Sequence, residues 1–121
     1  MRNMRNMTVL CIGDLLVEIM RPNIDDPLDE PGIFLGPYPS GASGIFVDAI
    51  SRLGVKAGFI GVVGDDDFGK AILRRLEGDG VEISNIKITK DYTTGVAFVT
   101  YLRDGNRKFI YHLSSVVRHR N

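Results

Sequence analysis

Tryptophan is absent from this chain, and cysteine occurs once, as Cys11, among 121 residues. A single cysteine excludes an internal disulfide. Because Cys11 lies within the apolar run Val9-Leu10-Cys11-Ile12, we expect a buried, unreactive thiol. This use of cysteine fits a reducing compartment, and we expect a cytoplasmic protein.

An excess of charge of either sign is also missing. The chain has 15 Lys and Arg residues against 15 Asp and Glu residues, and the two signs are interspersed. Such a chain has no broad basic surface for a polyanion, so we expect no nucleic-acid partner. The basic residues 118–120 are interpreted as a solvated chain end.

Long hydrophobic runs are lacking as well. Asp14 and Glu18 interrupt the apolar stretch near the amino end before a signal-peptide core or a membrane span is reached. We therefore expect no association with a membrane. With 44% hydrophobic and 25% charged residues, the chain has the composition of one globular unit with a single core.

What the sequence does contain is an alternation of strand and helix patterns. Short apolar runs at residues 8–13 and 57–63 predict buried strands, the first of which ends in Gly13-Asp14. Apolar spacings of three and four predict two helices that end near Gly54 and Gly78. The first helix is expected to pack on the sheet through a stripe made of Ala42, Ile45, Phe46, Ala49, Ile50 and Leu53. This order favours an α/β fold with a mostly parallel sheet and right-handed crossovers.

An antiparallel appendage is expected beside this sheet. Residues 95–101 and 108–113 are rich in β-forming side chains, and the Asp104-Gly105 pair between them is a strong hairpin signal. A further short strand is predicted at residues 85–89. Residues 15–36 are rich in turn-forming side chains and predict an excursion from the core.

One segment comes close to a phosphate-binding loop. Residues 64–71 satisfy G-x-x-x-x-G-K, but Ala71 stands where such a loop needs Ser or Thr to hold magnesium. Three consecutive carboxylates, Asp65, Asp66 and Asp67, would repel phosphates. We expect instead that Asp66 or Asp67 caps the following helix. The alternative is a metal site built from the three, and we assign no metal ligand.

Two other glycine-rich segments, residues 58–64 and residues 40–44, are candidates for ligand binding. No G-x-G-x-x-G follows the first predicted strand, which argues against a dinucleotide site. Residues 40–44, Ser-Gly-Ala-Ser-Gly, precede the first helix, where backbone N–H groups can face a ligand oxygen. An ordinary helix start explains this segment equally well.

Taken together, four segments resemble the amino-terminal half of the PfkB carbohydrate kinases, the ribokinase-like family. They are Gly13-Asp14, Pro39-Ser40-Gly41-Ala42, residues 61–69 (GVVGDDDFG) and Thr94-Gly95-Val96-Ala97. The resemblance covers about residues 8–113. It implies that residues 1–121 form the amino-terminal portion of one truncated ribokinase-like domain, a three-layer α/β/α fold. Its small β lid would be built from segments near 15–36 and 95–113.

The same resemblance implies transfer of the ATP γ-phosphoryl group to a sugar hydroxyl, with Mg²⁺ required. Matched by position, Asp14 would accept hydrogen bonds from sugar hydroxyls and Gly41 would let the chain approach the sugar closely. Ala97, with His112 as a further candidate on the next strand, would face the sugar from the lid. A carboxylate at the carboxyl end of a strand is well placed for this role, because open α/β sheets bind ligands there.

The chain departs from the family pattern at several positions. Ser40 replaces the first of two glycines, and Ile45 replaces an asparagine that binds the sugar. The catalytic base of the family is an aspartate in a G-x-G-D sequence, and neither G-x-G-D nor the magnesium-linked N-x-x-E pattern occurs in these 121 residues. No catalytic residue is therefore assigned, and the ATP and Mg²⁺ sites are expected outside this chain. Residues 114–121 also diverge from the family.

Two hypotheses follow. In the first, the chain supplies the sugar-binding half and the lid of an ATP-dependent sugar kinase. In the second, it is a catalytically inactive fragment that acts at most as a sugar-binding or self-association module. A small-molecule sugar is the expected partner in both, and pairing of two subunits through the β lid is a further expectation.

Overall fold

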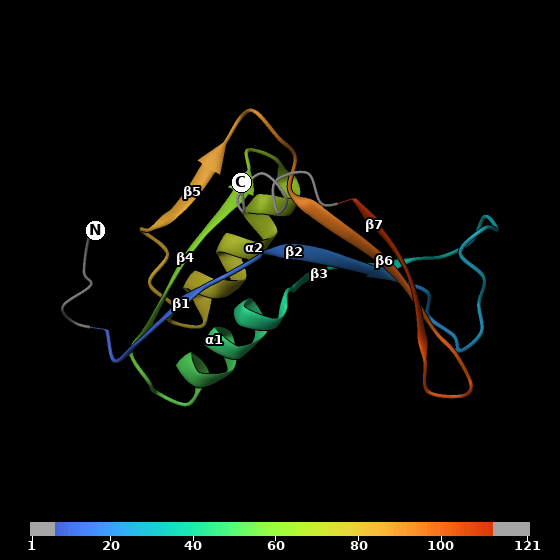
Figure 1. Cartoon of the computed structure of the whole chain (residues 1–121), viewed down its shortest axis with the longest axis horizontal. Helices are drawn as coiled ribbons and strands as arrows, with labels where there is room; N and C mark the ends of the chain where they lie inside the picture. The colour runs from blue at the N-terminus through green and yellow to red at the C-terminus, as the bar shows by residue number, and fades with distance from the viewer. Residues whose placement is uncertain (1–6, 113–121) are drawn as a thin grey trace.

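The structure is a computed structural model that describes residues 7–112, and its strands form two sheets that lie end to end (Figure 1). One sheet is covered by two helices and holds most of the hydrophobic core. The other extends away from the core as the lid. The expectation for residues 114–121 falls outside the described residues.

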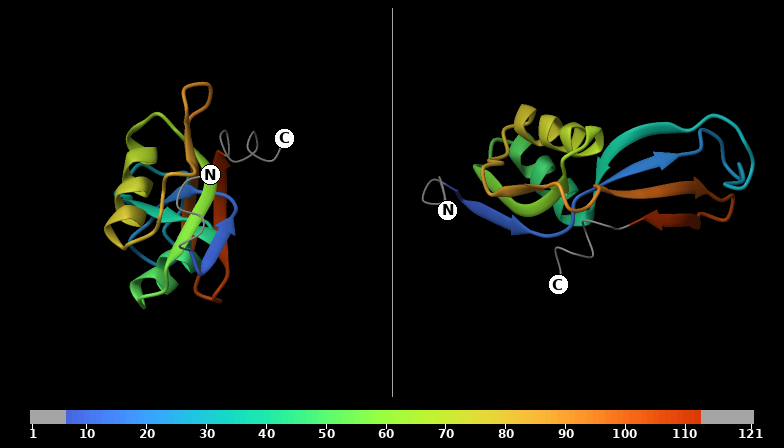
Figure 2. Two further views of the ribbon diagram at one scale, coloured as in Figure 1. Left: turned by 90° about the vertical axis from the view of Figure 1, so that its left-hand side faces the viewer. Right: turned by 90° about the horizontal axis from the view of Figure 1, so that it is seen from above.

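The core sheet is parallel and has the strand order β1-β4-β5. Strand β1 (Val9–Ile12) pairs with β4 (Ala57–Gly64), which pairs with β5 (Ile86–Thr89). Helices α1 (Ala42–Arg52) and α2 (Asp67–Gly78) lie on the same side of this sheet (Figure 2). The predicted strands and the predicted strand–helix alternation are thus confirmed.

The lid sheet has the order β3-β2-β6-β7. Strand β2 (Leu16–Met20) is antiparallel to β3 (Leu35–Ser40) and parallel to β6 (Gly95–Tyr101). The appendage is therefore a mixed sheet, and the expectation of an antiparallel one was wrong because β2 and β6 belong to distant segments whose relative direction no local pattern sets. Strand β7 (Arg107–His112) pairs antiparallel with β6, which confirms the predicted hairpin. Gly105 adopts φ 89° in its turn, a left-handed conformation that glycine reaches without strain.

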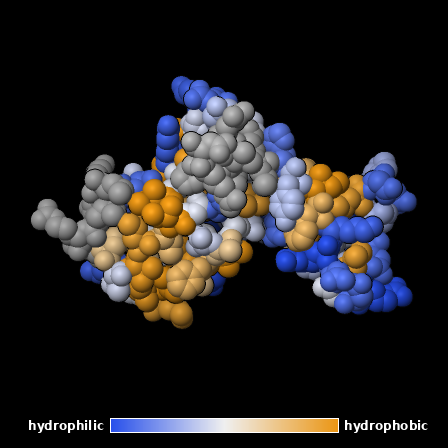
Figure 3. Space-filling model, viewed as in Figure 1, coloured by the Kyte–Doolittle hydropathy of each residue, from blue (hydrophilic) through white to orange (hydrophobic). Residues whose placement is uncertain are grey.

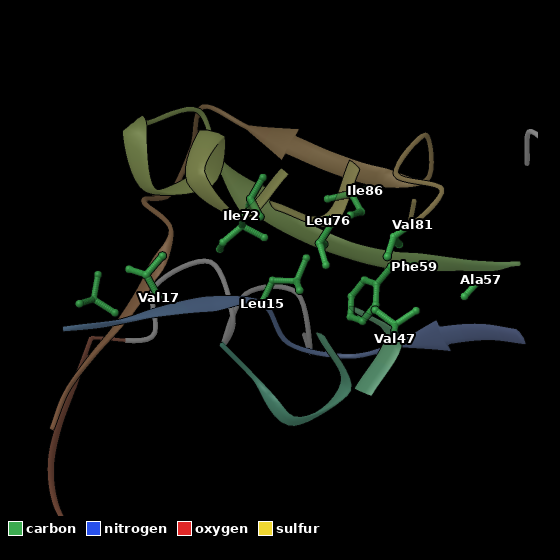
Figure 4. Close-up of a cluster of buried hydrophobic side chains, with 11 residues drawn as sticks. Leu15, Val17, Val47, Ala57, Phe59, Ile72, Leu76, Val81 and Ile86 are labelled. Atoms are coloured by element: carbon green, nitrogen blue, oxygen red, sulfur yellow. The ribbon is translucent and has the colours of Figure 1, made fainter. Parts of the chain in front are cut away.

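Side chains from both helices and from the sheet meet in one hydrophobic core. Phe59 of β4 is fully buried and lies beside Val47 of α1, in a cluster that also includes Ile72 and Leu76 of α2 (Figure 4). The core continues into the lid through Val17 of β2. The lid therefore shares the core of the main sheet at the point where it is attached.

The apolar stripe predicted to pack α1 against the sheet is largely exposed in the structure. Gly44 and Val47 are the buried residues of this helix, whereas Ile45 and Phe46 are 55% and 53% exposed. The prediction was wrong because apolar spacing locates a helical face but does not say which neighbour covers it. For α2 the prediction is confirmed, since Ile72 and Leu76 are buried.

Arg21 organises the excursion between β2 and β3. Its guanidinium group donates hydrogen bonds to the carbonyl oxygens of Pro27, Glu30 and Ile33 and lies 4.1 Å from the ring centre of Phe34. A planar guanidinium group can serve several acceptors at once, which suits it to holding a loop. The sequence did not indicate this role, because the acceptors are backbone groups up to 12 positions away.

Within residues 7–112, neither helix has the length and apolar character needed to cross a bilayer. Cys11 is half-buried, and burial raises the pKa of its thiol. A raised pKa keeps the thiol protonated and weakly nucleophilic, as expected from the sequence.

Candidate functional site

The core sheet and the lid are joined where β1 ends and β2 begins. Gly13 and Asp14 form this junction and lead directly into Leu15, which is buried in the core. Asp14 thus lies at the carboxyl end of a parallel strand, the edge at which open α/β sheets bind ligands.

Gly41 lies directly against this junction. It connects β3 to α1 with φ 100°, and a Cβ atom at this position would collide with the carbonyl oxygen of Asp14. Next to it, Ser40 of β3 is paired with Leu16 of β2. The structure therefore brings Asp14 and Gly41 together, and only glycine combines this backbone conformation with this close approach.

The lid strands place Ala97 beside Glu18, a carboxylate that was not among the predicted site residues. Ala97 of β6 pairs with Glu18 of β2 on one side and with Tyr111 of β7 on the other. Glu18 pairs in turn with Tyr38 of β3. Residues paired across neighbouring strands lie on one face of a sheet. The row Tyr38, Glu18, Ala97 and Tyr111 thus crosses all four strands, with small Ala97 between larger side chains.

Glu18 is also connected to the glycine junction. The hydroxyl of Ser40, which directly precedes Gly41, donates a hydrogen bond of 3.3 Å to Oε2 of Glu18. One signal in the sequence could have revealed Glu18: it is the only charged side chain in the otherwise apolar strand Leu16–Met20. A carboxylate in such a strand needs a polar partner or a ligand.

His112 lies apart from this row. It pairs with Val96, the neighbour of Ala97 along β6. Because successive side chains of a strand point to opposite faces, His112 lies on the opposite face of the lid from Ala97. The lid therefore does not bring these two predicted site residues together.

Asp66 and Thr94, both from the family motifs, bind each other. Thr94 donates from its backbone N–H to Oδ2 of Asp66 at 2.8 Å and from its hydroxyl to Oδ1 at 2.7 Å. The Thr94 hydroxyl also accepts from the N–H of Gly64 at 2.9 Å. Asp66 caps α2 by accepting from the N–H of Gly69 at 2.8 Å, which confirms the predicted cap. This cluster fixes the start of β6 against the start of α2.

The electrostatics of Asp66 agree with a structural role. Burial alone would raise the pKa of this carboxyl, but the hydrogen bonds from Thr94 and Gly69 outweigh it and lower the pKa. Asp66 is therefore ionised at the amino end of α2. It already accepts the hydrogen bond from the N–H of Gly69 that a phosphate at this helix end would need. Residues 64–71 do not fit a bound triphosphate. Within the described part of the chain, no group of three or more His, Cys, Asp or Glu side chains is placed to hold a metal ion.

A cavity of about 210 Å³ lies between α1 and α2 and reaches Leu15 and Ser40 beside the junction. Asp48, Arg52 and Arg75 line it together with apolar side chains of both helices. Burial, a hydrogen bond with Asp79 and the charge of Asp79 raise the pKa of Asp48 to about 6.

A parallel α/β core, a β lid and a carboxylate-bearing junction between them define a lidded α/β domain. Residues 35–120 match the pfkB family of carbohydrate kinases, and the match includes residues 114–120, which were expected to diverge from the family. The chain belongs to this family.

Proteins from plants and bacteria support this assignment. Over 104 residues, 86% of this chain, it is 35% identical to "Probable fructokinase-3" of Arabidopsis thaliana and 34% identical to the fructokinase of Solanum tuberosum. These matches cover 30% and 32% of the two relatives, so the chain spans about a third of the length of the curated proteins it matches.

Solved structures share the fold. A structure from E. coli titled "putative Ribokinase II" is 46% identical and superposes with a TM-score of 0.89 over 93% of this chain and 37% of that one. A second structure with this title, in complex with ATP and Mg²⁺, gives a TM-score of 0.87. The fructokinase of Xylella fastidiosa is 28% identical, with a TM-score of 0.74 over 88% of this chain and 33% of that one. The expected ribokinase-like fold is thus confirmed.

Proposed function

We propose that this chain supplies the sugar-binding part and the lid of a carbohydrate kinase that transfers the γ-phosphoryl group of ATP to a sugar hydroxyl. The observation that carries the proposal is the contact between Gly41 and the Asp14 junction. Gly41 directly follows Ser40, whose hydroxyl donates a hydrogen bond to Glu18 of the lid. Family membership supports the reaction class.

In this proposal the carboxylates of Asp14 and Glu18 accept hydrogen bonds from sugar hydroxyls. A carboxylate has two oxygens and can accept from neighbouring hydroxyls at once. Gly41, without a side chain, leaves room for the sugar at the start of α1. Ala97 is assigned to the lid surface above the sugar, between Glu18 and Tyr111 on the neighbouring strands. His112, on the other face of the lid, is given no role in contacting the sugar.

ATP and Mg²⁺ belong to the proposed reaction, and the described residues do not fit them. Mg²⁺ neutralises charge on the transferred phosphoryl group when bound. The G-x-G-D base is absent from the sequence, so we expect this chain alone to bind sugar without turning it over. Fructose is the first sugar to test, because the curated relatives are named fructokinases.

Isothermal titration of the chain with fructose, ribose and a panel of other sugars tests the binding step. We expect saturable binding of one sugar class, lost in Gly41→Val. A coupled assay of ADP release tests turnover by the same sample, and we expect none. If no sugar binds, or if binding survives Gly41→Val in a folded variant, the proposed site is wrong.

The second candidate function is that of a non-catalytic module. The absence of G-x-G-D favours it for this chain by itself. Sugar binding without any kinase activity, even after the chain is combined with the rest of a family domain, would support this candidate over the first.

A further inference from the structure

The cavity between α1 and α2 is lined by one face of each helix. The lining positions recur at spacings of three and four, namely 45, 48, 49 and 52 on α1 and 72, 75 and 76 on α2. Ile72 and Leu76 are buried, and Ile45 is 55% exposed. Figure 3 shows hydrophobic colouring over the region that α1 occupies in the view of Figure 1. Most of the lining is apolar, so the cavity suits an apolar group.

Charged groups gather where the two helices end. Arg52 is the last residue of α1, and Arg75 lies in the last turn of α2. Asp48 lies one turn before Arg52, and Asp79 is the C-cap residue of α2. Within residues 7–112, neither arginine forms an ion pair. Their charges nevertheless act on the carboxyl group of Asp48, so the four groups form one cluster.

Asp48 is poorly satisfied in its ionised form. Its Oδ1 atom is buried and has no hydrogen-bond partner among the described residues. The hydrogen bond with Asp79 needs a proton on one of the two carboxyl groups, because a carboxylate only accepts. Burial, this hydrogen bond and the charge of Asp79 raise the pKa of Asp48 to about 6. The charges of Arg75 and Arg52 act in the opposite direction and do not compensate.

The charges around the cavity define what can fill it. Leu15, Pro39 and Ser40, which line it from the junction and from β3, add no charge. With all groups ionised, the cluster carries two positive and two negative charges. A complementary ligand brings both signs, an anionic group for the arginines and a cationic one for the carboxylates. The cavity of about 210 Å³ lies below the roughly 300–1,000 Å³ of pockets for drug-sized ligands, so the ligand is small.

We propose that this cavity is a binding site for a free amino acid with an apolar side chain, such as leucine. Its carboxylate accepts hydrogen bonds from Arg52 and Arg75, since guanidinium groups match carboxylates in geometry. Its ammonium group supplies the positive charge that ionised Asp48 lacks. Its side chain lies against Ile72 and Leu76.

This inference does not rest on the proposed sugar site. Arg52 follows Gly41 by 11 positions, all of them within α1. At a rise of about 1.5 Å per residue, the charged end of the cavity is about 16 Å from the glycine junction along the helix axis. A sugar held at the junction therefore does not reach this cluster.

Isothermal titration of the chain with L-leucine and three matched probes tests the proposal. Isocaproate lacks the ammonium group, isopentylamine lacks the carboxylate, and glycine lacks the apolar side chain. We expect L-leucine to bind and each probe to bind at least about tenfold more weakly, because each loses one of the three contacts. The proposal is overturned if leucine, valine and phenylalanine all fail to bind, or if any probe binds as tightly as L-leucine.

Substitutions locate the binding to this cavity. Asp48→Asn and Arg75→Gln should each weaken L-leucine binding about tenfold or more. Arg74→Gln is the matched control, because Arg74 is exposed on the same helix and does not line the cavity. Circular dichroism establishes that each variant is folded. Equal losses in Arg74→Gln and Arg75→Gln, or parental affinity in both Asp48→Asn and Arg75→Gln, would contradict the assignment.

The pH dependence of binding provides a second readout. The ammonium group of leucine needs ionised Asp48, so L-leucine should bind about tenfold more weakly at about pH 5 than at about pH 8. Asp48→Asn should remove this dependence, since Arg52 and Arg75 keep their charge throughout this range. Equal affinity of the parent chain at both pH values would overturn the proposal.

Discussion

Thr94 binds both carboxylate oxygens of Asp66, through its backbone N–H at 2.8 Å and its hydroxyl at 2.7 Å. The two residues are 28 positions apart, one just before the lid strand β6 and the other at the amino cap of α2. This contact ties the lid to the core.

Thr94→Val should destabilise the fold. Valine keeps the shape of the side chain but leaves the N–H of Gly64 and one oxygen of Asp66 without the hydroxyl, in a region where residue 94 is 1% exposed. An unsatisfied buried polar group costs about 1–3 kcal/mol. Denaturant unfolding should show a loss of this size, whereas Thr93→Val at the exposed neighbouring position should change little. Equal stability of the two variants would show that the Thr94 hydroxyl is dispensable.

Alanine substitutions at Gly41 and Gly54 distinguish the cost of a steric clash from the cost of backbone strain. Both have positive φ, 100° and 95°, but a Cβ atom at Gly41 would collide with Asp14, whereas one at Gly54 would meet nothing within 4 Å. Gly54→Ala should therefore cost about 1–2 kcal/mol from strain alone. Gly41→Ala should cost more and should also weaken sugar binding, as measured by unfolding and by isothermal titration. The contact between Gly41 and Asp14 would be contradicted if both variants lost the same stability.

Glu18→Gln should weaken sugar binding by about tenfold or more, because a charged hydrogen-bond acceptor contributes roughly 1.5–3 kcal/mol. The amide keeps the size of the side chain, so the fold should remain intact. Glu30→Gln is the control, since only its backbone carbonyl takes part in the recorded contact with Arg21. Isothermal titration with the best sugar of the panel measures both. Unchanged affinity in Glu18→Gln would remove Glu18 from the site.

The raised pKa of Asp48 predicts a pH-dependent stability. Its pKa rises from 3.8 to about 6 in the folded chain, so the folded state binds the proton more tightly than the unfolded state. The stabilisation from this proton is present below pH 3.8 and is lost as the pH rises through 6. Asp48→Asn should therefore raise the melting temperature at pH 8 more than at pH 4.

The comparison is made between the variant and the parent chain at each pH, so that other titrating groups, among them Asp66, cancel. Asp29→Asn, at an exposed position, serves as the control and should show no pH-dependent gain. A gain for Asp48→Asn that is equal at pH 4 and pH 8 would mean that the charge of Asp48 is not the cause.

Arg21→Lys should loosen the excursion between β2 and β3. A lysine ammonium group cannot reproduce the planar set of donors that Arg21 directs at three backbone carbonyls. Hydrogen exchange of residues 22–34 should accelerate about tenfold, while the core strands stay protected. Arg103→Lys is the control, because the side chain of Arg103 makes an exposed ion pair with Asp25, which a lysine can also form. Unchanged exchange in Arg21→Lys would show that other contacts hold the excursion.

Sequence alone determined the elements of this protein. The apolar runs of β1 and β4, the spacing of Ile72 and Leu76 in α2, the capping carboxylate Asp66 and the Asp104-Gly105 turn are each set by side chains within a few positions of one another. Local patterns of this kind act through backbone preference and periodicity, which require no knowledge of distant neighbours.

Tertiary structure decided which residues meet. Glu18 lies beside Ala97 because strand register fixes which side chains share a face, and this register is set between segments about 80 positions apart. The register of the β6–β7 hairpin likewise places His112 on the opposite face. The face of α1 that is buried depends on which elements pack against the helix. The hydrogen bonds of Arg21 likewise depend on where the chain places the backbone carbonyls of its loop. Such contacts join residues far apart in the sequence and produce no local sequence pattern. The full set of residues in the candidate site could therefore not be predicted from the sequence.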